Sequence, residues 1–429
     1  MKKVLIITYY WPPAGGPGIQ RIIKIVRHLP AMGWQPVILT VNEGDYPAID
    51  KGLADDIPES CKVYKTGIME PYNIYRKLTG KSSGEKIPTF VLNPEKSDSF
   101  RDKIAKWIRT TIFIPDARIG WIPYAVKAGK KIIAEEKIDL IFSSSPPQTV
   151  QLIAKKLAKK SGLKWVADFR DPWTEAFWAA ELQKEGMVKK INQRLETSVL
   201  KKADAVVSVS EGVVDLLRKK AENQYSVIHN GFESANNRKV SSNKFTILFF
   251  GHLNKYQHRE TLFKALSSLP ADIRDQIELV FVGKVFDGFQ RFLAQYQQLN
   301  VVLQAYMPYK ELMEFAGKAS ILYRPLSNMS YAQSGVGAKT FDYLALRKPV
   351  LAIGLKDSYV EKILNRTGSG KFFLENEVPE MAEFLLNQFE LWKQNGGLLL
   401  PDNPELDEFK TKFNVERLTA IFDDLTDSR

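Results

Sequence analysis

The sequence predicts an α/β protein built from two doubly wound, Rossmann-like domains. Short apolar runs typical of buried parallel strands alternate with segments of helical periodicity along the chain. This pattern starts again after a polar stretch at 234–244, which is rich in Ser, Asn and Lys and has the composition of a linker. In addition, 429 residues exceed what one ordinary core accommodates, so two domains are expected.

Strands and helices alternate through the first half of the chain. Strands are expected at 4–8, 37–41, 139–142, 165–169, 205–209 and 226–228. Helices are expected at 19–31, 121–136, 149–160, 188–201 and 212–221. Residues 71–120 interrupt this rhythm, because aromatic residues there are interleaved with Lys and Arg. We therefore expect a first domain of residues 1–230, in which 71–120 form a basic, aromatic lid.

The second half repeats the alternation with a new set of elements. Strands are expected at 245–250, 277–282, 301–304, 319–323 and 350–353. Helices are expected at 259–268, 289–298, 309–317 and 339–346, with a final amphipathic helix at 406–425. The predicted second domain is 231–404, and we expect 405–429 to pack back toward the first domain. Two such domains would place a ligand cleft between the carboxyl ends of both sheets.

Composition excludes several classes of protein. A single cysteine, Cys61, excludes a disulfide framework and a cysteine metal cluster, and the four histidines show no metal-ligand spacing. No stretch approaches the roughly 20 apolar residues that a membrane span needs. The apolar run near the amino terminus leads into a Pro/Gly loop instead of a signal-peptide cleavage site. We therefore expect a cytoplasmic protein without a bound metal.

The positive charge is concentrated in the first half. Residues 1–230 contain 37 Lys and Arg against 25 Asp and Glu, a net charge of +12, whereas the remainder contains 24 of each. Nucleic acid is not the expected partner, because no helix-turn-helix, zinc or single-strand-binding pattern accompanies the charge. An anionic membrane surface fits better, since residues 71–120 combine rings and cations as peripheral interfacial segments do. The alternatives are a solvated basic surface and an ordinary lid packed on its domain.

The stretch from Gly337 to Ala345 predicts a phosphate site. It follows an apolar strand and a turn-rich loop, and its helix is expected to begin at about Lys339. Such a loop directs backbone N–H groups and the positive end of a helix dipole toward one place. Lys339 adds a full charge, and Asp342 shares its side of the helix, where a carboxylate would accept from ribose hydroxyls. The alternative is a glycine loop that binds no phosphate, which is common in doubly wound proteins.

Polar residues at other strand ends are further candidates. In the first half, glycines come just before a helix, where their backbone can approach a phosphate. Charged groups stand at the end of the strand at 165–169, and burying these charges without a ligand or partners would be costly. These first-half candidates are Gly15, Gly16, Arg21, Ser145, Asp168, Arg170 and Asp171. For the last three, a structural Arg–Asp pair is the alternative. The second-half candidates for donor and base contacts are Gly251, Lys255, Arg259, Gly283 and Met307.

In their order and spacing, these segments resemble the family 4 glycosyltransferases of bacterial surface-polysaccharide synthesis, which have the GT-B fold. The resemblance covers nearly the whole chain. It rests on Pro-Pro-x-Gly-Gly-x-Gly at 12–18 with Arg21, Ile114-Pro115-Asp116 before Trp121, Asp168 to Trp173, Asn230-Gly231-Phe232, Arg259 in Arg-x-x-x-Leu, and Lys339 to Ala345 followed by Pro349-Val350.

The resemblance implies transfer of a sugar from a nucleotide-diphosphate sugar to a glycan or lipid-linked acceptor, with retention of configuration. It implies that Arg259 and Lys339 hold the diphosphate, and that Asp342 accepts from the ribose. Gly15 and Gly16 would close over the donor. No metal, cofactor or protein nucleophile is implied, because fixed positive charge stabilises the leaving diphosphate. For Asp168, Arg170 and Asp171 we expect a role in orienting the acceptor or the sugar.

Three residues depart from the pattern of the family. Ser334 stands where the first of two glutamates is common, and Asp342 stands at the second. His252 replaces an arginine frequent in the family, and Gln151 replaces a histidine. These departures leave two other interpretations open, namely a non-catalytic scaffold that binds sugar nucleotide or glycan, and a sugar-nucleotide epimerase of the same fold.

Overall fold

The chain forms two compact units. The computed structural model describes residues 1–44, 46, 49–50, 52–69, 114–176, 186–235, 240, 243–329 and 331–427. The first unit comprises Met1–Asn230 together with Thr411–Arg429, and the second comprises Gly231–Lys410. Most of the predicted lid at 71–120 lies outside the described residues.

The first unit is built on a parallel sheet of seven described strands in the order β3-β2-β1-β4-β5-β6-β7. The strands are β1 (Lys2–Ile7), β2 (Trp34–Val41), β3 (Lys62–Thr66), β4 (Leu140–Ser145), β5 (Lys164–Phe169), β6 (Ala205–Ser208) and β7 (Tyr225–Val227). The helices are α1 (Pro17–His28), α4 (Ile122–Glu136), α5 (Thr149–Ser161), α7 (Met187–Leu200), α8 (Glu211–Arg218) and α17 (Thr411–Asp427), with 3-10 turns η1 (Leu29–Met32), η2 (Gly52–Asp56) and η3 (Ile119–Trp121).

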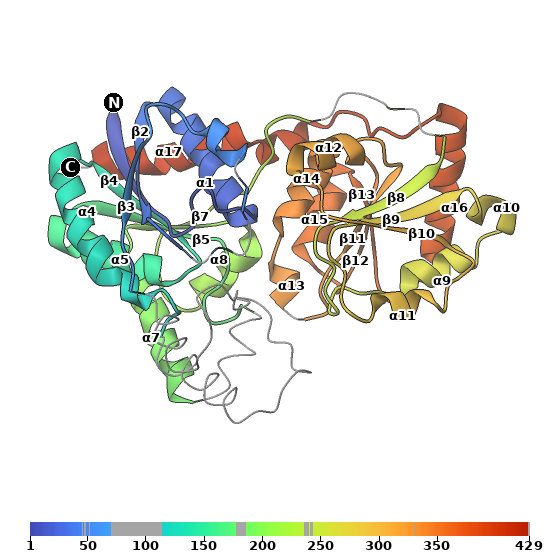
Figure 1. Cartoon of the computed structure of the whole chain (residues 1–429), viewed down its shortest axis with the longest axis horizontal. Helices are drawn as coiled ribbons and strands as arrows, with labels where there is room; N and C mark the ends of the chain where they lie inside the picture. Colours follow the sequence, from blue (N-terminus) through green and yellow to red (C-terminus); the bar gives the residue numbers. More distant parts are fainter. Residues whose placement is uncertain are drawn as a thin grey trace. The chain divides into compact units, whose positions relative to one another are not determined.

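Alternate side chains of a strand point to opposite faces of this sheet. In β1, Val4 and Ile6 pack in a core with α1 and α17, whereas Leu5 and Ile7 pack in a second core with α4 and α5. Both faces are therefore buried, so the strand is apolar throughout instead of alternating. Figure 1 shows these helices flanking the sheet.

The second unit repeats this architecture with six described strands, in the order β10-β9-β8-β11-β12-β13. The strands are β8 (Phe245–Phe250), β9 (Ile277–Val282), β10 (Asn300–Gln304), β11 (Ile321–Pro325), β12 (Val350–Ile353) and β13 (Gly370–Phe373). The helices are α9 (Thr261–Ser267), α10 (Ala271–Arg274), α11 (Phe289–Leu293), α12 (Tyr309–Ala316), α13 (Tyr331–Ser334), α14 (Ala338–Leu346), α15 (Tyr359–Thr367) and α16 (Val378–Asn395), with the 3-10 turn η4 (Pro404–Phe409). Within this unit, Figure 1 shows α14 and α15 on one side of the sheet and α9 and α16 on the other.

The prediction of two doubly wound α/β domains is confirmed, with differences at the edges. The strands β3 and β13 were not predicted, because each is a short edge strand in which lysine interrupts the apolar pattern. The final helix predicted at 406–425 is two elements, since η4 ends at Phe409 in the second unit and α17 begins at Thr411 in the first. Lys410 between them is extended, so no continuous helix forms. Among the described residues, no helix is both long and apolar enough to cross a membrane.

A buried carboxylate ties three elements together at the amino-terminal edge of the first sheet. Glu136, at the end of α4, accepts hydrogen bonds from the Tyr64 hydroxyl at 2.6 Å, from Lys62 Nζ at 2.9 Å and from Lys3 Nζ at 3.0 Å. These donors lower the pKa of Glu136 from 4.5 to about 2, with the Tyr64 hydroxyl as the largest cause.

Replacing this carboxylate is expected to destabilise the fold. Because the folded-state pKa is depressed, Glu136 contributes stability above pH 4.5, and this contribution is lost as the pH falls from 4.5 to about 2. Glu136→Gln should lower the free energy of unfolding in urea by about 2 kcal/mol at pH 7 and flatten the loss between pH 4.5 and 2. Glu135→Gln is the control, since that exposed side chain faces Lys131 at 3.6 Å and should change stability by less than about 0.5 kcal/mol. Equal effects of the two substitutions would contradict this assignment.

Candidate functional site

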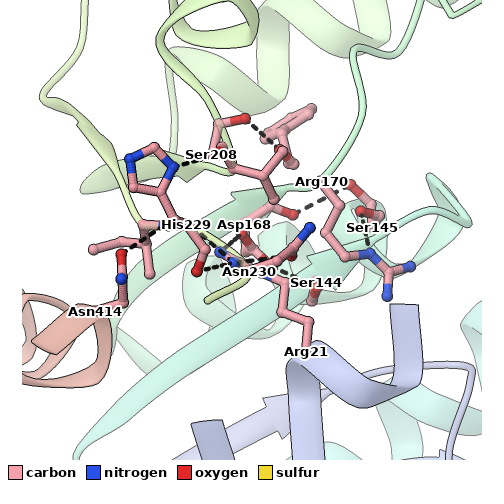
Figure 2. Close-up of polar contacts among 12 residues, drawn as sticks. Arg21, Ser144, Ser145, Asp168, Arg170, Ser208, His229, Asn230 and Asn414 are labelled. Carbon is pink, nitrogen blue, oxygen red and sulfur yellow. Dashed lines mark hydrogen bonds and ion pairs between the residues drawn. The ribbon is translucent and has the colours of Figure 1, made fainter. Parts of the chain in front are cut away.

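In the first unit, the predicted charged residues converge where β5 ends (Figure 2). Arg21 on α1 donates from Nη2 and Nε to the two oxygens of Asp168, at 2.8 and 3.1 Å. Ser144 Oγ donates to the same carboxylate at 2.6 Å. Arg21 and Asp168 are both buried, and Arg21 Nη1 also donates to the carbonyl oxygen of Ile228 at 2.7 Å. The pair thus joins α1, β5 and the segment after β7.

Arg170 is likewise held by internal contacts. Its Nε donates to the carbonyl oxygen of Ser145 at 3.1 Å, its Nη1 to that of Gly18 at 2.6 Å, and its Nη2 to that of Pro146. A Cβ on Gly18 would lie 2.4 Å from Nη1, so only glycine permits this approach. Burial lowers the pKa of Arg170, and the carbonyl dipoles hold its charge in place. The geometry favours Arg170 as a clamp between the glycine loop and the end of β4.

Several other predicted side chains of this unit also have structural contacts. Ser145 Oγ is buried between Gln151 Nε2, at 2.9 Å, and the carbonyl oxygen of Asp168, at 3.3 Å. Asp116 accepts from the backbone N–H and the hydroxyl of Thr149, both at 2.8 Å, and so caps α5. The family histidine that Gln151 replaces therefore has a buried amide in its place, bonded to the hydroxyls of Ser143 and Ser145 on β4 and to the carbonyl oxygen of Asp168 on β5.

Asp171 differs from its neighbours. Its carboxylate is half-buried and has no hydrogen bond or ion pair to any residue that the structure describes. Burial raises the pKa of Asp171, with Asp168 acting in the same direction and Arg170 opposing it. A carboxyl group whose charge is disfavoured by burial, and that has no partner among the described residues, is suited to accept a hydrogen bond from a ligand hydroxyl.

The glycine loop presents an uncapped helix end in the same unit. Gly16 is the N-cap of α1 with φ 115°, no side chain caps the helix, and its first turn carries no acidic residue. A Cβ at Gly16 would meet nothing within 4 Å, whereas one at Gly15 would lie 3.1 Å from Asp50 Cβ. The backbone of Gly16 can therefore approach an anion or a sugar closely.

In the second unit, the predicted lysine lies across the end of β8. Lys339, in the first turn of α14, places Nζ 4.6 Å from the centre of the Phe249 ring. A Cβ on Gly251, whose φ is 104°, would lie 2.6 Å from this Nζ. A Cβ on Gly283 would lie 2.6 Å from the carbonyl oxygen of Gly251. Gly251 thus makes room for the lysine, and Gly283 makes room for the backbone of Gly251.

The Lys339 ammonium is electrostatically unsatisfied. Burial, followed by repulsion from Arg324, lowers its pKa to about 7, and Asp342 opposes the shift. No carboxylate lies within ion-pair distance of Nζ in the part of the chain that the structure describes. A lysine in this state gains most from a bound anion.

The other side chains predicted in the sequence analysis to bind the sugar nucleotide differ in their contacts. Asp342 accepts from the Tyr309 hydroxyl at 2.8 Å, which fixes its carboxylate on α14, and burial followed by Asp342 raises the pKa of Tyr309. Arg259, in contrast, donates from Nη1 to the carbonyl oxygens of Tyr256 and His258, and from Nη2 to that of Leu326 at 2.7 Å.

Arg259 therefore clamps two loops. It also precedes α9, whose first residue is Thr261, and does not lie in the helix as predicted. Of the remaining candidates, Lys255 is exposed with Nζ 5.2 Å from the Tyr256 ring, Met307 is half-buried before α12, and Ser334 ends α13.

Two family models match the sequence in succession. Residues 86–235 match the model described as Glycosyltransferase Family 4, and residues 232–390 match Glycosyl transferases group 1. The chain belongs to the family 4 glycosyltransferases. An uncharacterized glycosyltransferase of Methanocaldococcus jannaschii is 21% identical to this family member over 246 residues, which is 53% of this chain and 60% of that relative.

Solved structures share the fold of this family 4 member. Sucrose-phosphate synthase from Thermosynechococcus elongatus superimposes with a TM-score of 0.63 at 12% identity, covering 100% of both chains. HepE of Anabaena, solved in complex with UDP, has a TM-score of 0.59 at 14% identity and covers 99% of this chain and 100% of its own. The GT-B fold that the resemblance implied is confirmed.

The sequence of this family 4 member did not point to Arg324 or Tyr309. Arg324 lies one residue beyond the strand predicted at 319–323 and is part of β11, and Tyr309 opens α12 without a recognisable motif. A charged residue within a buried strand was the available signal for Arg324, since such a charge needs a partner or a ligand.

Proposed function

We propose that this chain transfers a sugar from a nucleoside-diphosphate sugar to a glycan or lipid-linked acceptor, with retention of configuration, in cell-surface polysaccharide synthesis. The observation that carries the proposal is Lys339, a half-buried ammonium in the first turn of an uncapped helix, beside glycines that end two strands. Membership of family 4 supports it, as does the UDP bound by the structurally similar HepE.

In this proposal, the second unit binds the donor. The diphosphate lies against Lys339 and the N–H groups at the start of α14. Asp342, held by Tyr309, accepts hydrogen bonds from the ribose hydroxyls. Gly283 and Met307 provide backbone contacts for the base. Ser334, in place of a glutamate, offers the sugar a hydroxyl where related chains offer a carboxylate.

The proposed reaction needs no nucleophile from the protein. The bond between the anomeric carbon and the phosphate oxygen breaks, and the acceptor hydroxyl attacks from the same face. The departing phosphate takes the acceptor proton. Lys339 stabilises the charge that develops on the diphosphate, which is the electrostatic form of catalysis. The proposal includes no cofactor, because fixed cations provide this charge; the described residues contain no group of three or more His, Cys, Asp or Glu arranged to hold a metal ion.

In the first unit we propose that Asp171 orients the acceptor or the transferred sugar. The backbone of Gly16 would contact an anion or a sugar. Four other side chains would then hold this edge of the first sheet in place without touching substrate, namely those of Arg21, Ser145, Asp168 and Arg170. The net charge of +12 on residues 1–230 supports an anionic membrane surface as the place where a lipid-linked acceptor is met.

The test is release of nucleoside diphosphate from a panel of sugar nucleotides in the presence of extracted lipid-linked glycans. Turnover with one donor, together with an α-linked product from an α-linked donor, would support the proposal. Tight nucleotide binding without turnover would favour the scaffold. Conversion of the sugar nucleotide without an acceptor would favour the epimerase.

A glycine substitution tests the placement of the diphosphate. Gly251→Ala would put a Cβ 2.6 Å from Lys339 Nζ and force the ammonium away. We expect nucleoside-diphosphate affinity to fall about tenfold by calorimetry. Gly368→Ala is the control, because its φ of 59° is also positive, so it too places alanine in the left-handed region in the same unit, without touching Lys339. If both variants bind equally well, Lys339 does not hold the diphosphate in this position.

A further inference from the structure

Arg324 is a buried cation without a carboxylate partner. It is 5% exposed, near the end of β11. Its Nη1 donates to the carbonyl oxygen of Pro325 at 3.1 Å, and its Nε lies 3.4 Å from Thr340 Oγ1. Across the described ranges, no Asp or Glu lies within ion-pair distance of it. Its guanidinium remains charged at neutral pH, so this burial has an electrostatic cost that an anion would offset.

The remaining nitrogen of Arg324 lies at the start of α14. A Cβ on Gly337 would lie 3.0 Å from Nη2. Gly337 is the exposed N-cap of α14, no side chain caps this helix, and its first turn carries no acidic residue. A guanidinium nitrogen and the positive end of a helix dipole therefore lie side by side.

Lys339 brings a second cation to the same place. It lies in the first turn of α14, and the charge of Arg324 is the second largest cause of its lowered pKa. Two cations that repel each other, neither with a carboxylate at ion-pair distance among the described residues, destabilise the protein unless an anion binds. The arrangement points to a ligand with at least two negative charges.

Two other basic groups near this edge, Arg259 and His252, are less suited than Arg324 to act as the second cation. Three of the five N–H groups of Arg259 are directed at backbone carbonyls, whereas Arg324 has one such carbonyl contact. Partial burial, then Lys284 and Lys339, lower the pKa of His252 from its ordinary value, which disfavours a positive charge on its imidazole. Arg324, which is buried and lies at the start of the helix that carries Lys339, is the cation that best complements it.

We propose that Arg324 binds the donor diphosphate directly, with Nη2 donating to one phosphate while Lys339 Nζ contacts the other. This inference rests on the proposed function, since it names the second cation of that donor site. A sugar diphosphate carries one negative charge on each phosphate, which matches one guanidinium and one ammonium. Arg324 is then a specificity determinant for diphosphates over monophosphates.

The experiment measures binding of inorganic pyrophosphate, of a panel of nucleoside diphosphates, and of the matching nucleosides by calorimetry. Arg324→Gln should weaken pyrophosphate and nucleoside diphosphate about tenfold or more and leave the nucleoside unchanged. Arg347→Gln is the matched control, because Arg347 is similarly buried at the other end of α14, where its Nη2 donates to the carbonyl oxygen of Leu400. It should bind both ligands as the wild type does.

A second variant tests whether Arg324 binds the diphosphate if Arg324→Gln fails to fold. Gly337→Ala crowds only Nη2, and its φ of −66° accepts alanine without strain. It should weaken pyrophosphate several-fold with little change in melting temperature. Full retention of pyrophosphate affinity in both variants, while Lys339→Ala loses it, would overturn the role of Arg324 and leave the proposed function standing. A wild-type protein that binds no nucleoside diphosphate would overturn the proposed function itself.

Discussion

Lys339→Met is expected to weaken nucleoside-diphosphate binding by about 10- to 150-fold and, at the same time, to stabilise the protein. The loss of affinity follows from removing a charge-assisted hydrogen bond to phosphate, worth about 1.5–3 kcal/mol. The gain in stability follows because burial, together with Arg324, opposes the charge on Lys339 in the absence of ligand. With partial exposure of the ammonium taken into account, we expect about 1–2 kcal/mol by urea unfolding at pH 7.

A second buried lysine provides the control with the opposite sign. Lys348 is 1% exposed, and its Nζ donates to the carbonyl oxygen of Leu398 at 2.7 Å. Lys348→Met should therefore reduce stability and leave nucleotide binding unchanged. A stabilised Lys339→Met variant that still binds the diphosphate would exclude Lys339 from the site. A destabilised variant would show that its charge is satisfied within the protein.

The same lysine gives donor binding a pH dependence. The groups that face its ammonium are Arg324 on β11, Asp342 on α14, and the Phe249 ring and His252 at the end of β8. Because the pKa in the ligand-free protein is about 7, affinity for a sugar diphosphate should be highest below pH 7. It should then fall by up to tenfold per unit as the pH rises above 7. Lys339→Arg, which keeps its charge, should bind with a flat profile between pH 6 and 9.

The stability dependence has a corresponding sign. Between pH 7 and 10.5 the unfolded chain holds the proton that folded Lys339 has lost, so the contribution of this residue to stability rises with pH. The rise should be absent from Lys339→Met. These two pH profiles separate the effect on binding from the effect on folding.

The sequence predicted the location of the candidate site better than its contacts. Buried parallel strands such as β8 and β9 are continuous apolar runs, so their carboxyl ends could be located, and Gly251, Gly283 and Lys339 do lie together there. Whether a cation is bonded internally depends on which carbonyls the loops bring near it. That information is absent from the linear pattern. The prediction that Arg259 holds phosphate could not include its contacts with three backbone carbonyls, and Arg324, one residue beyond the predicted strand, was not named as a candidate.

The sequence also did not show which charged residues at the end of β5 are structural. Asp168 in β5 and Asp171 just after it are three residues apart, and we expect a structural role for the first and a functional role for the second. Asp168→Asn would leave Arg21 buried without its carboxylate, and we expect a loss of about 3–5 kcal/mol of stability in urea unfolding. Asp171→Asn should be at least as stable as the wild type. Its pKa is raised, so its charge is disfavoured in the folded state above pH 3.8.

Activity should order the two variants differently from stability. Asp171→Asn should release nucleoside diphosphate at least tenfold more slowly with saturating donor, because the carboxylate that orients a substrate hydroxyl is gone. For Asp168→Asn, any loss should follow the fraction of unfolded protein and recover when the temperature is lowered, as expected of a positioning residue. A stable and inactive Asp168→Asn would instead assign that carboxylate to the chemistry. Full activity of Asp171→Asn would remove the carboxylate of Asp171 from the proposed acceptor contacts.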